Sequence, residues 1–247
     1  MFDPTPRAGT RLPSWLGRVA GALPNRCAVC QAGGSGPEAR LCGDCLACFA
    51  PLRPRCERCA LQLPAAATVC GRCVREPPPW THAVAACDYG YPWDGLLGAL
   101  KFEAAIDLAP VLALQLARAV EARALPPIDV LLPVPLAPLR LRERGYNQAL
   151  LLAQPLARRF GLRVAVDALQ RPVETPHQVA LPREQRVANV RGAFLLDRAA
   201  VATLRGRHVA VVDDVMTTGA TIGEVTRVLH GAGVASVQAW VVARTPP

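Results

Sequence analysis

The sequence predicts an α/β fold in which helices cover both faces of a mainly parallel β-sheet, preceded by a small cysteine-rich module. Three observations lead to this prediction. Strand-like apolar runs alternate with helical patterns through the C-terminal two thirds. Four Cys-x-x-Cys pairs crowd into residues 27–73, and one apolar run ends in two acids, a threonine-rich turn and a helical pattern. We therefore divide the chain into an N-terminal segment (1–25), a cysteine module (26–75) and an α/β domain (81–247).

The N-terminal segment lacks the sequence pattern of an export signal. Residues 14–23 fit a short amphipathic helix, but no apolar core of a signal peptide precedes or follows them. No run of about 18 uncharged apolar residues occurs, so we expect no membrane-spanning helix. We expect a cytoplasmic protein, with peripheral binding at the inner face of the cell membrane as an alternative. The net charge of +9 fits an anionic ligand or partner, although a basic surface without a dedicated partner fits it equally well.

The cysteine module contains an internal repeat. Eight of the ten cysteines form four Cys-x-x-Cys pairs, with eleven residues between pairs in the first half and ten in the second. Each pair forms a knuckle, and two knuckles close a tetrahedral, structural zinc site of four thiolates. Without an export signal, disulfides are not expected. We expect pairing in sequence order, with a crossed arrangement or a single ion left open. The predicted ligands are Cys27, Cys30, Cys42, Cys45, Cys56, Cys59, Cys70 and Cys73.

Cys87 is expected to be a small buried hydrophobe, while Cys48 lies close to the first site and is left open as a decoy ligand. The four histidines are expected not to bind metal. Because so short a segment cannot bury much apolar surface, the ions would have to supply its folding energy, on the order of 10 kcal/mol per site. The sequence EPPPW at 76–80 then predicts a stiff linker to the next domain.

The α/β domain begins with a strand at 82–89, because this run is apolar and short. Helical spacing follows at 94–101 and 106–123. The apolar, β-branched run at 128–134 is interrupted by proline and predicts a buried strand that ends in a loop. Residues 147–160 form a strongly amphipathic helix, for which Gly161 is a natural end.

The second half of the domain repeats the alternation of strands and helices. We expect a strand near 164–166 and a short one at 194–195. Residues 171–193 are polar, arginine-rich and too long for a simple connection, so they are expected to form a functional flap. The final predicted elements are a strand at 208–212, a helix at 218–230 and a strand at 234–242.

Residues 209–222, VAVVDDVMTTGATI, carry most of the functional information. A buried strand ends in Asp213 and Asp214, which can accept hydrogen bonds from vicinal ribose hydroxyls or help hold a divalent metal. The turn that follows offers amides and hydroxyls to an anion at a helix N-terminus. The sequence therefore predicts a sugar-phosphate site, with a polar-capped corner as the structural alternative. The expected phosphate ligands are Thr217, Thr218, Gly219, Ala220 and Thr221.

This pattern resembles the signature of the type I phosphoribosyltransferases, which bind phosphoribosyl pyrophosphate (PRPP). The resemblance implies that Asp213 and Asp214 face the ribose 2′ and 3′ hydroxyls and that the threonine turn wraps the 5′-phosphate. From about residue 15 onward, the cysteine module and three further segments are similar to the ComF family of bacterial proteins, which is associated with DNA uptake during natural transformation. The three segments are ALKF at 99–102, residues 131–153 and residues 169–194.

The same resemblance implies roles for other residues. PVPL at 133–136 takes the position of the loop that contacts pyrophosphate, and a flap at 171–189 would close over PRPP. Lys101 is a further candidate for an anion contact, although EAAID follows it where relatives tend to carry glycine or basic residues. Each of these groups could instead cap a helix or be solvated. The remaining predicted PRPP ligands are Arg140, Arg144, Asn147, Gln148, Arg183 and Arg186.

The implied reaction is displacement of pyrophosphate from the anomeric carbon of PRPP, with Mg²⁺ bridging pyrophosphate and ribose. The leading hypothesis is a magnesium-dependent phosphoribosyltransferase that serves DNA uptake. The alternative is a non-enzymatic PRPP sensor, or an adaptor that binds single-stranded DNA on a phosphoribosyltransferase fold. Docking of uptake proteins by the zinc module is compatible with either. The sequence predicts neither the acceptor nor the oligomeric state.

Overall fold

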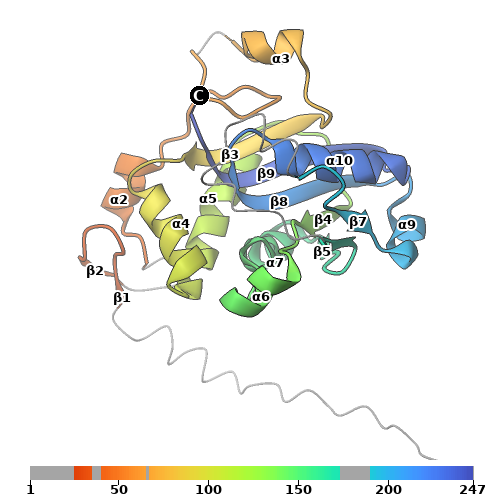
Figure 1. The fold of residues 1–247 in the computed structure, drawn as a ribbon. Coiled ribbons are helices and arrows are strands. Elements are labelled where there is room, and N and C mark those ends of the chain that lie inside the picture. Colours follow the sequence, from red (N-terminus) through yellow and green to blue (C-terminus); the bar gives the residue numbers. More distant parts are fainter. Residues whose placement is uncertain (1–24, 35–39, 65–66, 173–189, 247) are drawn as a thin grey trace, which may run out of the picture.

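The computed structural model describes residues 25–34, 40–64, 67–172 and 190–246. Its centre is a five-stranded sheet in the order β3-β9-β8-β4-β5, and every neighbouring pair is parallel (Figure 1). The predicted mainly parallel sheet is thereby confirmed. Its strands are β3 (His82–Asp88), β4 (Val130–Pro133), β5 (Arg163–Val164), β8 (His208–Met216) and β9 (Ser236–Arg244).

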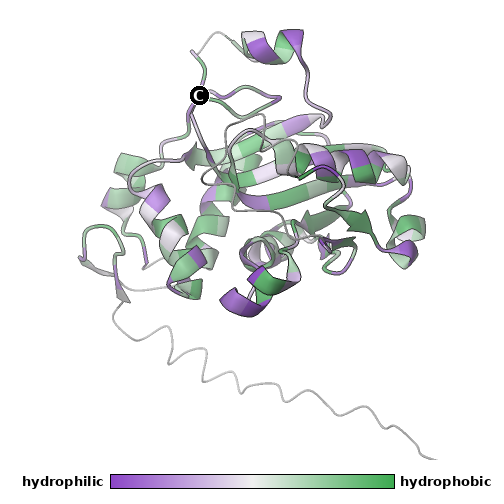
Figure 2. Cartoon of the chain, viewed as in Figure 1, coloured by the Kyte–Doolittle hydropathy of each residue, from purple (hydrophilic) through white to green (hydrophobic). Residues whose placement is uncertain are grey.

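Helices cover both faces of this sheet, as predicted. One face carries α4 (Trp93–Phe102), α5 (Ala109–Glu121) and α7 (Gln148–Phe160), whose apolar sides share one buried core with the sheet. The other face carries α10 (Ala220–Gly231) and a second core. Figure 2 shows the strands as predominantly hydrophobic, which is typical of a parallel sheet buried on both faces.

Short elements connect these layers. A single 3₁₀ turn, η1 (Ile106–Leu108), opens the predicted helix at 106–123. The strand expected at 194–195 is β7 (Leu195–Leu196), which pairs antiparallel with β6 (Leu169–Gln170). Among the described helices of the α/β domain, two were not predicted, α6 (Pro138–Arg144) and α9 (Arg198–Leu204), because each has only one or two turns and α6 buries none of its residues.

Strand β8 is longer than predicted. The sequence pattern ends the strand at Val212, since adjacent aspartates are poor strand formers. In the structure β8 continues to Met216, because its ladder with β9 continues through Asp213↔Val241, Val215↔Ala243 and Met216↔Arg244. The acid pair is therefore held rigidly inside the last part of a strand and not on the loop after it.

The cysteine module forms two separate units, described here as ribbon 1 (25–34 and 40–50) and ribbon 2 (54–64 and 67–75). Ribbon 1 contains β1 (Asn25–Arg26), β2 (Gly33–Gly34) and α2 (Gly43–Phe49), and it packs against α4 and α5. Ribbon 2 contains α3 (Gly71–Arg75) and lies beside β3, where Ala83 donates a hydrogen bond to the carbonyl of Glu57. Figure 1 shows the two units at different places on the domain.

The last residue of the predicted linker is part of the packed structure, while Glu76, Pro77 and Pro79 are exposed. Trp80 is only 5% exposed and lies in the core beside α10. The predicted amphipathic helix at 14–23 and most of the predicted flap lie outside the described residues. Among the helices that the structure describes, none has the length and apolar character needed to span a bilayer.

Candidate functional site

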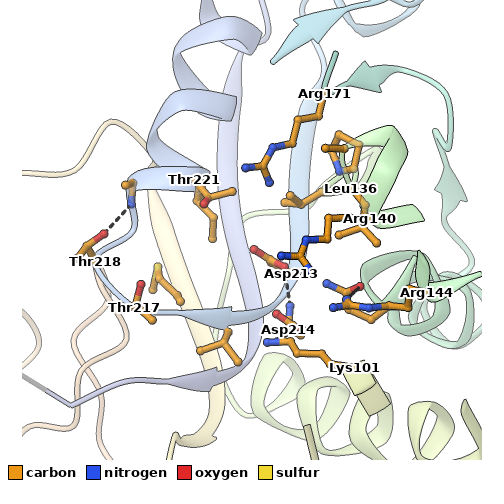
Figure 3. A pocket seen from close by; sticks show the side chains of 18 of the residues that line it. Lys101, Leu136, Arg140, Arg144, Arg171, Asp213, Asp214, Thr217, Thr218 and Thr221 are labelled. Atoms are coloured by element: carbon orange, nitrogen blue, oxygen red, sulfur yellow. Dashed lines mark hydrogen bonds and ion pairs between the residues drawn. The ribbon is translucent and has the colours of Figure 1, made fainter. Parts of the chain in front are cut away.

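A cavity of about 770 Å³ opens at the carboxyl ends of the parallel strands, where ligands bind in sheets of this kind. Four basic and three acidic side chains line it, together with the whole loop 217–221, here called the threonine loop. In Figure 3 the acid pair lies between the threonine loop on one side and the basic groups on the other. The charged lining residues are Lys101, Arg140, Arg144, Arg171, Glu143, Asp213 and Asp214.

The threonine loop joins β8 to α10. Gly219 has a φ of +84° and precedes the first residue of α10 without a side-chain cap, so the first-turn amides of Thr221 and Ile222 are left for an external partner. The hydroxyl of Thr218 accepts a hydrogen bond from Ala220 N at 3.3 Å. A twelve-residue helix with its N-terminus at the cavity, next to three threonines, is suited to bind a phosphate.

The two aspartates differ in their surroundings. Asp214 is buried, and its Oδ2 lies 2.9 Å from Nζ of Lys101 on α4. Asp213 is half-buried, and its Oδ1 accepts a hydrogen bond from Asp214 N at 2.9 Å. Burial and the neighbouring Asp214 charge raise the pKa of Asp213 well above its ordinary value. A bound cation or a donor of hydrogen bonds would favour the ionised form of Asp213.

Lys101 therefore contacts the acid pair rather than standing alone at the cavity wall. Burial alone would lower its pKa, but the Asp214 carboxylate outweighs burial and raises it. Lys101 remains positively charged at neutral pH and still lines the cavity. It can neutralise Asp214 without a ligand and face an anion at the same time.

The loop after β4 and helices α6 and α7 form the opposite wall. Arg140, Arg144 and Gln148 line the cavity, and Nη1 of Arg144 donates to Oε1 of Gln148 at 2.5 Å. The Arg144 guanidinium also lies 5.5 Å from the centre of the Phe102 ring. These contacts hold Arg144 in place at the mouth of the cavity.

Asn147 has a different position. It does not line the cavity; it is the N-cap of α7, where its Oδ1 accepts from Ala149 N at 2.9 Å. Its Nδ2 donates to the carbonyl of Val134 at 3.0 Å. Both side-chain groups therefore fix the loop after β4 to the helix that follows it.

The structure adds Arg171, which the sequence assigned only to the flap. It follows β6, lines the cavity, and its guanidinium lies 5.3 Å from the centre of the Phe194 ring. Burial lowers the pKa of Arg171, while the charge of Asp213 acts in the opposite direction. The predicted ligands Arg183 and Arg186 lie outside the described residues.

The eight Cys-x-x-Cys cysteines form two four-cysteine sets in sequence order, so crossed pairing is excluded. Within each set the Sγ atoms lie within 4.8 Å of one another. Cys30 and Cys42 have their Sγ atoms 3.6 Å apart, as do Cys59 and Cys70. A tetrahedral zinc site with Zn–S bonds of about 2.3 Å places sulfurs about 3.8 Å apart. Both sets therefore fit zinc, and neither includes a histidine or Cys48.

Comparison with known proteins agrees with this geometry. Residues 147–246 match the family model described as "Phosphoribosyl transferase domain". The chain is 34% identical over 227 residues to "DNA utilization protein YhgH" of Escherichia coli O6:H1, covering 90% of this chain and 98% of that protein. It is 34% identical over 208 residues to "Competence protein F" of Haemophilus influenzae, covering 82% and 90%.

A solved structure, glutamine PRPP amidotransferase from B. subtilis complexed with ADP and GMP, aligns with a TM-score of 0.37. The identity is 20%, over 54% of this chain and 25% of the other.

The parallel sheet, the threonine loop and the matching family model define a phosphoribosyltransferase-like domain joined to two zinc-ribbon units. The identity over nearly the full length of the relatives defines the group more narrowly. The chain belongs to the ComF family, that of competence protein F and the YhgH DNA utilization proteins.

Proposed function

We propose that this protein binds PRPP with Mg²⁺ in the 770 Å³ cavity and transfers its phosphoribosyl group to an acceptor in the use of external DNA. The observation that carries the proposal is the position of the acid pair between the threonine loop and four cations. PRPP carries ribose hydroxyls, one phosphate and one pyrophosphate. It therefore needs hydrogen-bond acceptors for the hydroxyls as well as amides and cations for the two anionic groups, all in one cavity. The names of the relatives, DNA utilization protein and competence protein, support the link to DNA.

Each group has a role in this proposal. The amides and hydroxyls of the threonine loop bind the 5′-phosphate. Asp213 and Asp214 accept hydrogen bonds from the ribose hydroxyls, while Arg140, Arg144 and Arg171 bind the pyrophosphate. As the C1–O bond to pyrophosphate breaks, the acceptor's nucleophilic atom bonds to C1, and the arginines stabilise the departing charge.

Magnesium would enter with the substrate. The oxygen ligands that the cavity offers, the Asp213 carboxylate and the threonine hydroxyls, are of the type that Mg²⁺ prefers. The ion supplies positive charge to the pyrophosphate when bound. Arg171, whose guanidinium interacts with the charge of Asp213, offsets part of the negative charge of the same carboxylate.

Isothermal titration calorimetry with PRPP and Mg²⁺ tests the binding step. The double variant Asp213→Asn, Asp214→Asn should lose binding by at least about a hundredfold, since hydrogen bonds to charged groups contribute about 1.5–3 kcal/mol each. The matched control is Asp44→Asn, Asp167→Asn, which changes the net charge equally at two exposed positions outside the cavity. Equal affinities of the two double variants would disprove the proposed ribose role.

A second measurement separates transfer from sensing. Release of pyrophosphate from bound PRPP, with nucleosides, nucleotides and single-stranded DNA as candidate acceptors, is expected for a transferase. Binding without release in the presence of every acceptor would favour a PRPP sensor.

We also propose that each four-cysteine set holds one structural Zn²⁺. The Sγ spacing supports this, and so do the backbone amides of Cys42 and Cys70, which donate to the sulfurs of Cys27 and Cys56 at 3.4 and 3.3 Å. Metal analysis of the purified protein should give two zinc ions per chain. One ion per chain, or iron in place of zinc, would contradict the proposal.

A further inference from the structure

Arg244, the last residue of β9, connects ribbon 2 to the start of the threonine loop. Its side chain is buried, and its Nε donates to the carbonyl of Cys59 at 2.8 Å. Its Nη1 donates to the carbonyl of Met216 at 2.9 Å and to that of Thr217. One guanidinium therefore holds the backbone of a predicted metal ligand and the backbone at which the loop begins.

Trp80 connects the same ribbon to the other end of the loop. Its indole Nε1 donates to the carbonyl of Arg58 at 2.6 Å. The far edge of its ring covers Gly219, where a Cβ atom would lie only 2.7 Å from Cη2 of Trp80. The ring also reaches Gly223 in the first turn of α10, at 3.7 Å from its Cβ position. Trp80 thus forms the surface on which the loop turns into the helix.

Both contacts use one knuckle of ribbon 2. Arg58 and Cys59 are neighbours within the pair Cys56-Glu57-Arg58-Cys59. The contacts of ribbon 1 go to other elements: Trp93 of α4 donates to the carbonyl of Phe49 at 3.0 Å, and Arg40 forms an ion pair with Asp107 at 2.7 Å. Ribbon 2 is therefore the one whose backbone reaches the anion-binding end of the cavity.

We propose that Arg244 and Trp80 are positioning residues that couple the second four-cysteine site to the threonine loop. When the sulfurs of Cys56 and Cys59 share one ion, the knuckle has a fixed backbone, and the carbonyls of Arg58 and Cys59 have fixed positions. Arg244 and Trp80 then hold Met216, Thr217 and Gly219 in the conformation that presents the loop amides to phosphate. Loss of the ion loosens the loop from a distance, without touching a phosphate ligand.

Hydrogen exchange of the loop amides tests this coupling directly and needs no ligand. Arg244→Lys and Trp80→Phe should each increase exchange of the Ala220 and Gly223 amides, which bond to Thr218 and Gly219, by about tenfold, the effect of losing roughly 1.4 kcal/mol of local hydrogen bonding. Phenylalanine has no indole donor and lacks the outer ring atoms that reach Gly219 and Gly223, so this change removes both contacts of Trp80. Cys59→Ser, which removes a ligand of the second site, should have the same or a larger effect, whereas Cys48→Ser should have none.

The controls are residues of the same types that bind ribbon 1 and not the loop. Arg40→Lys alters a guanidinium of ribbon 1 that pairs with Asp107 at 2.7 Å. Trp93→Phe removes the indole donor to ribbon 1. Both should leave loop exchange within about twofold of wild type. Equal loosening by these controls, or unchanged exchange in the Arg244 and Trp80 variants, would overturn the coupling.

The functional consequence rests on the proposed PRPP binding and is measured separately. The variants that loosen the loop should bind PRPP with Mg²⁺ about tenfold more weakly. If the wild-type protein binds no PRPP, the proposed function fails while the exchange data still decide the coupling. If the loop loosens and PRPP affinity stays at the wild-type value, the loop is coupled to ribbon 2 but does not bind the phosphate, which overturns the positioning role.

Discussion

Lys101 Nζ lies 2.9 Å from Asp214 Oδ2, and this ion pair joins helix α4 to the end of strand β8. The Asp214 side chain is 5% exposed and that of Lys101 is 21% exposed. The carboxylate that the sequence assigns to a ribose hydroxyl is therefore already neutralised by a residue of the chain itself. A ligand that binds at this position therefore contacts an existing ion pair. It does not have to supply the positive charge that neutralises Asp214.

The ion pair predicts an asymmetric effect of mutation. Lys101→Met leaves Asp214 charged and buried, so the free energy of unfolding should fall by about 3 kcal/mol. Asp214→Asn should cost less, about 1 kcal/mol, because the partly exposed Lys101 can be hydrated. The double variant should be more stable than the sum of the two losses predicts, as measured by chemical denaturation. Strictly additive losses would mean that the pair contributes nothing.

The raised pKa of Asp213 predicts opposite pH effects on stability and on binding. Burial and the charge of Asp214 raise this pKa to about 8. The folded state therefore favours the protonated form, so the contribution to stability is fully present below the ordinary pKa of an aspartate and is lost as the pH rises through about 8. Affinity for PRPP with Mg²⁺, which uses the carboxylate, should instead increase over the same range.

Asp213→Asn is the matching variant, because asparagine resembles the protonated aspartate. Its unfolding free energy should lack this part of the decline between about pH 4 and about pH 8, measured by denaturation at constant ionic strength. An identical decline in wild type and variant would assign the pH dependence to another group.

Gly219 should tolerate no side chain. Its φ of +84° disfavours other residues, and a Cβ would meet Cη2 of Trp80 at 2.7 Å. Gly219→Ala should therefore lower the unfolding free energy by about 2 kcal/mol or more. Gly98→Ala is the control, because this glycine lies inside α4 with nothing within 4 Å of its Cβ position. That change should stabilise the protein by about 0.5–1 kcal/mol.

Asn147 should contribute more to stability than to ligand affinity. Asn147→Ala removes the cap of α7 and the hydrogen bond to Val134, which should cost about 2 kcal/mol. Asn147→Asp keeps the cap acceptor but places a carboxylate against the Val134 carbonyl, so it should also destabilise. PRPP affinity of the alanine variant, measured by calorimetry, should change by less than about threefold. A large loss of affinity with normal stability would instead make Asn147 a ligand.

The sheet was predictable because strands buried on both faces must be apolar along their whole length, as Val209 to Val212 are. The two four-cysteine sets were predictable for a similar reason, since a knuckle needs its two cysteines at fixed spacing. The threonine loop follows β8 directly, so its place at the cavity also follows from local sequence.

Contacts between distant segments were not predictable. Lys101 could be recognised as a lone lysine near the site, but its partner Asp214 comes from a strand much later in the chain. Trp80 resembled part of a proline-rich linker, and only the folded structure brings it onto Gly219. Arg244 ends an apolar strand, and nothing in its neighbourhood indicates that it bonds to Cys59. Local patterns define elements, whereas these pairings depend on how the elements pack.

Ribbon 2 also lies along β3, which is the last strand at its side of the sheet. An uncovered outer strand offers its free amides and carbonyls to the same strand of another molecule, and this is a common start of aggregation. If ribbon 2 holds the proposed zinc ion, removal of that ion is expected to let the protein self-associate through β3 before the rest of the domain unfolds. The proposed ion would then keep the outer strand covered, independently of any ligand in the cavity.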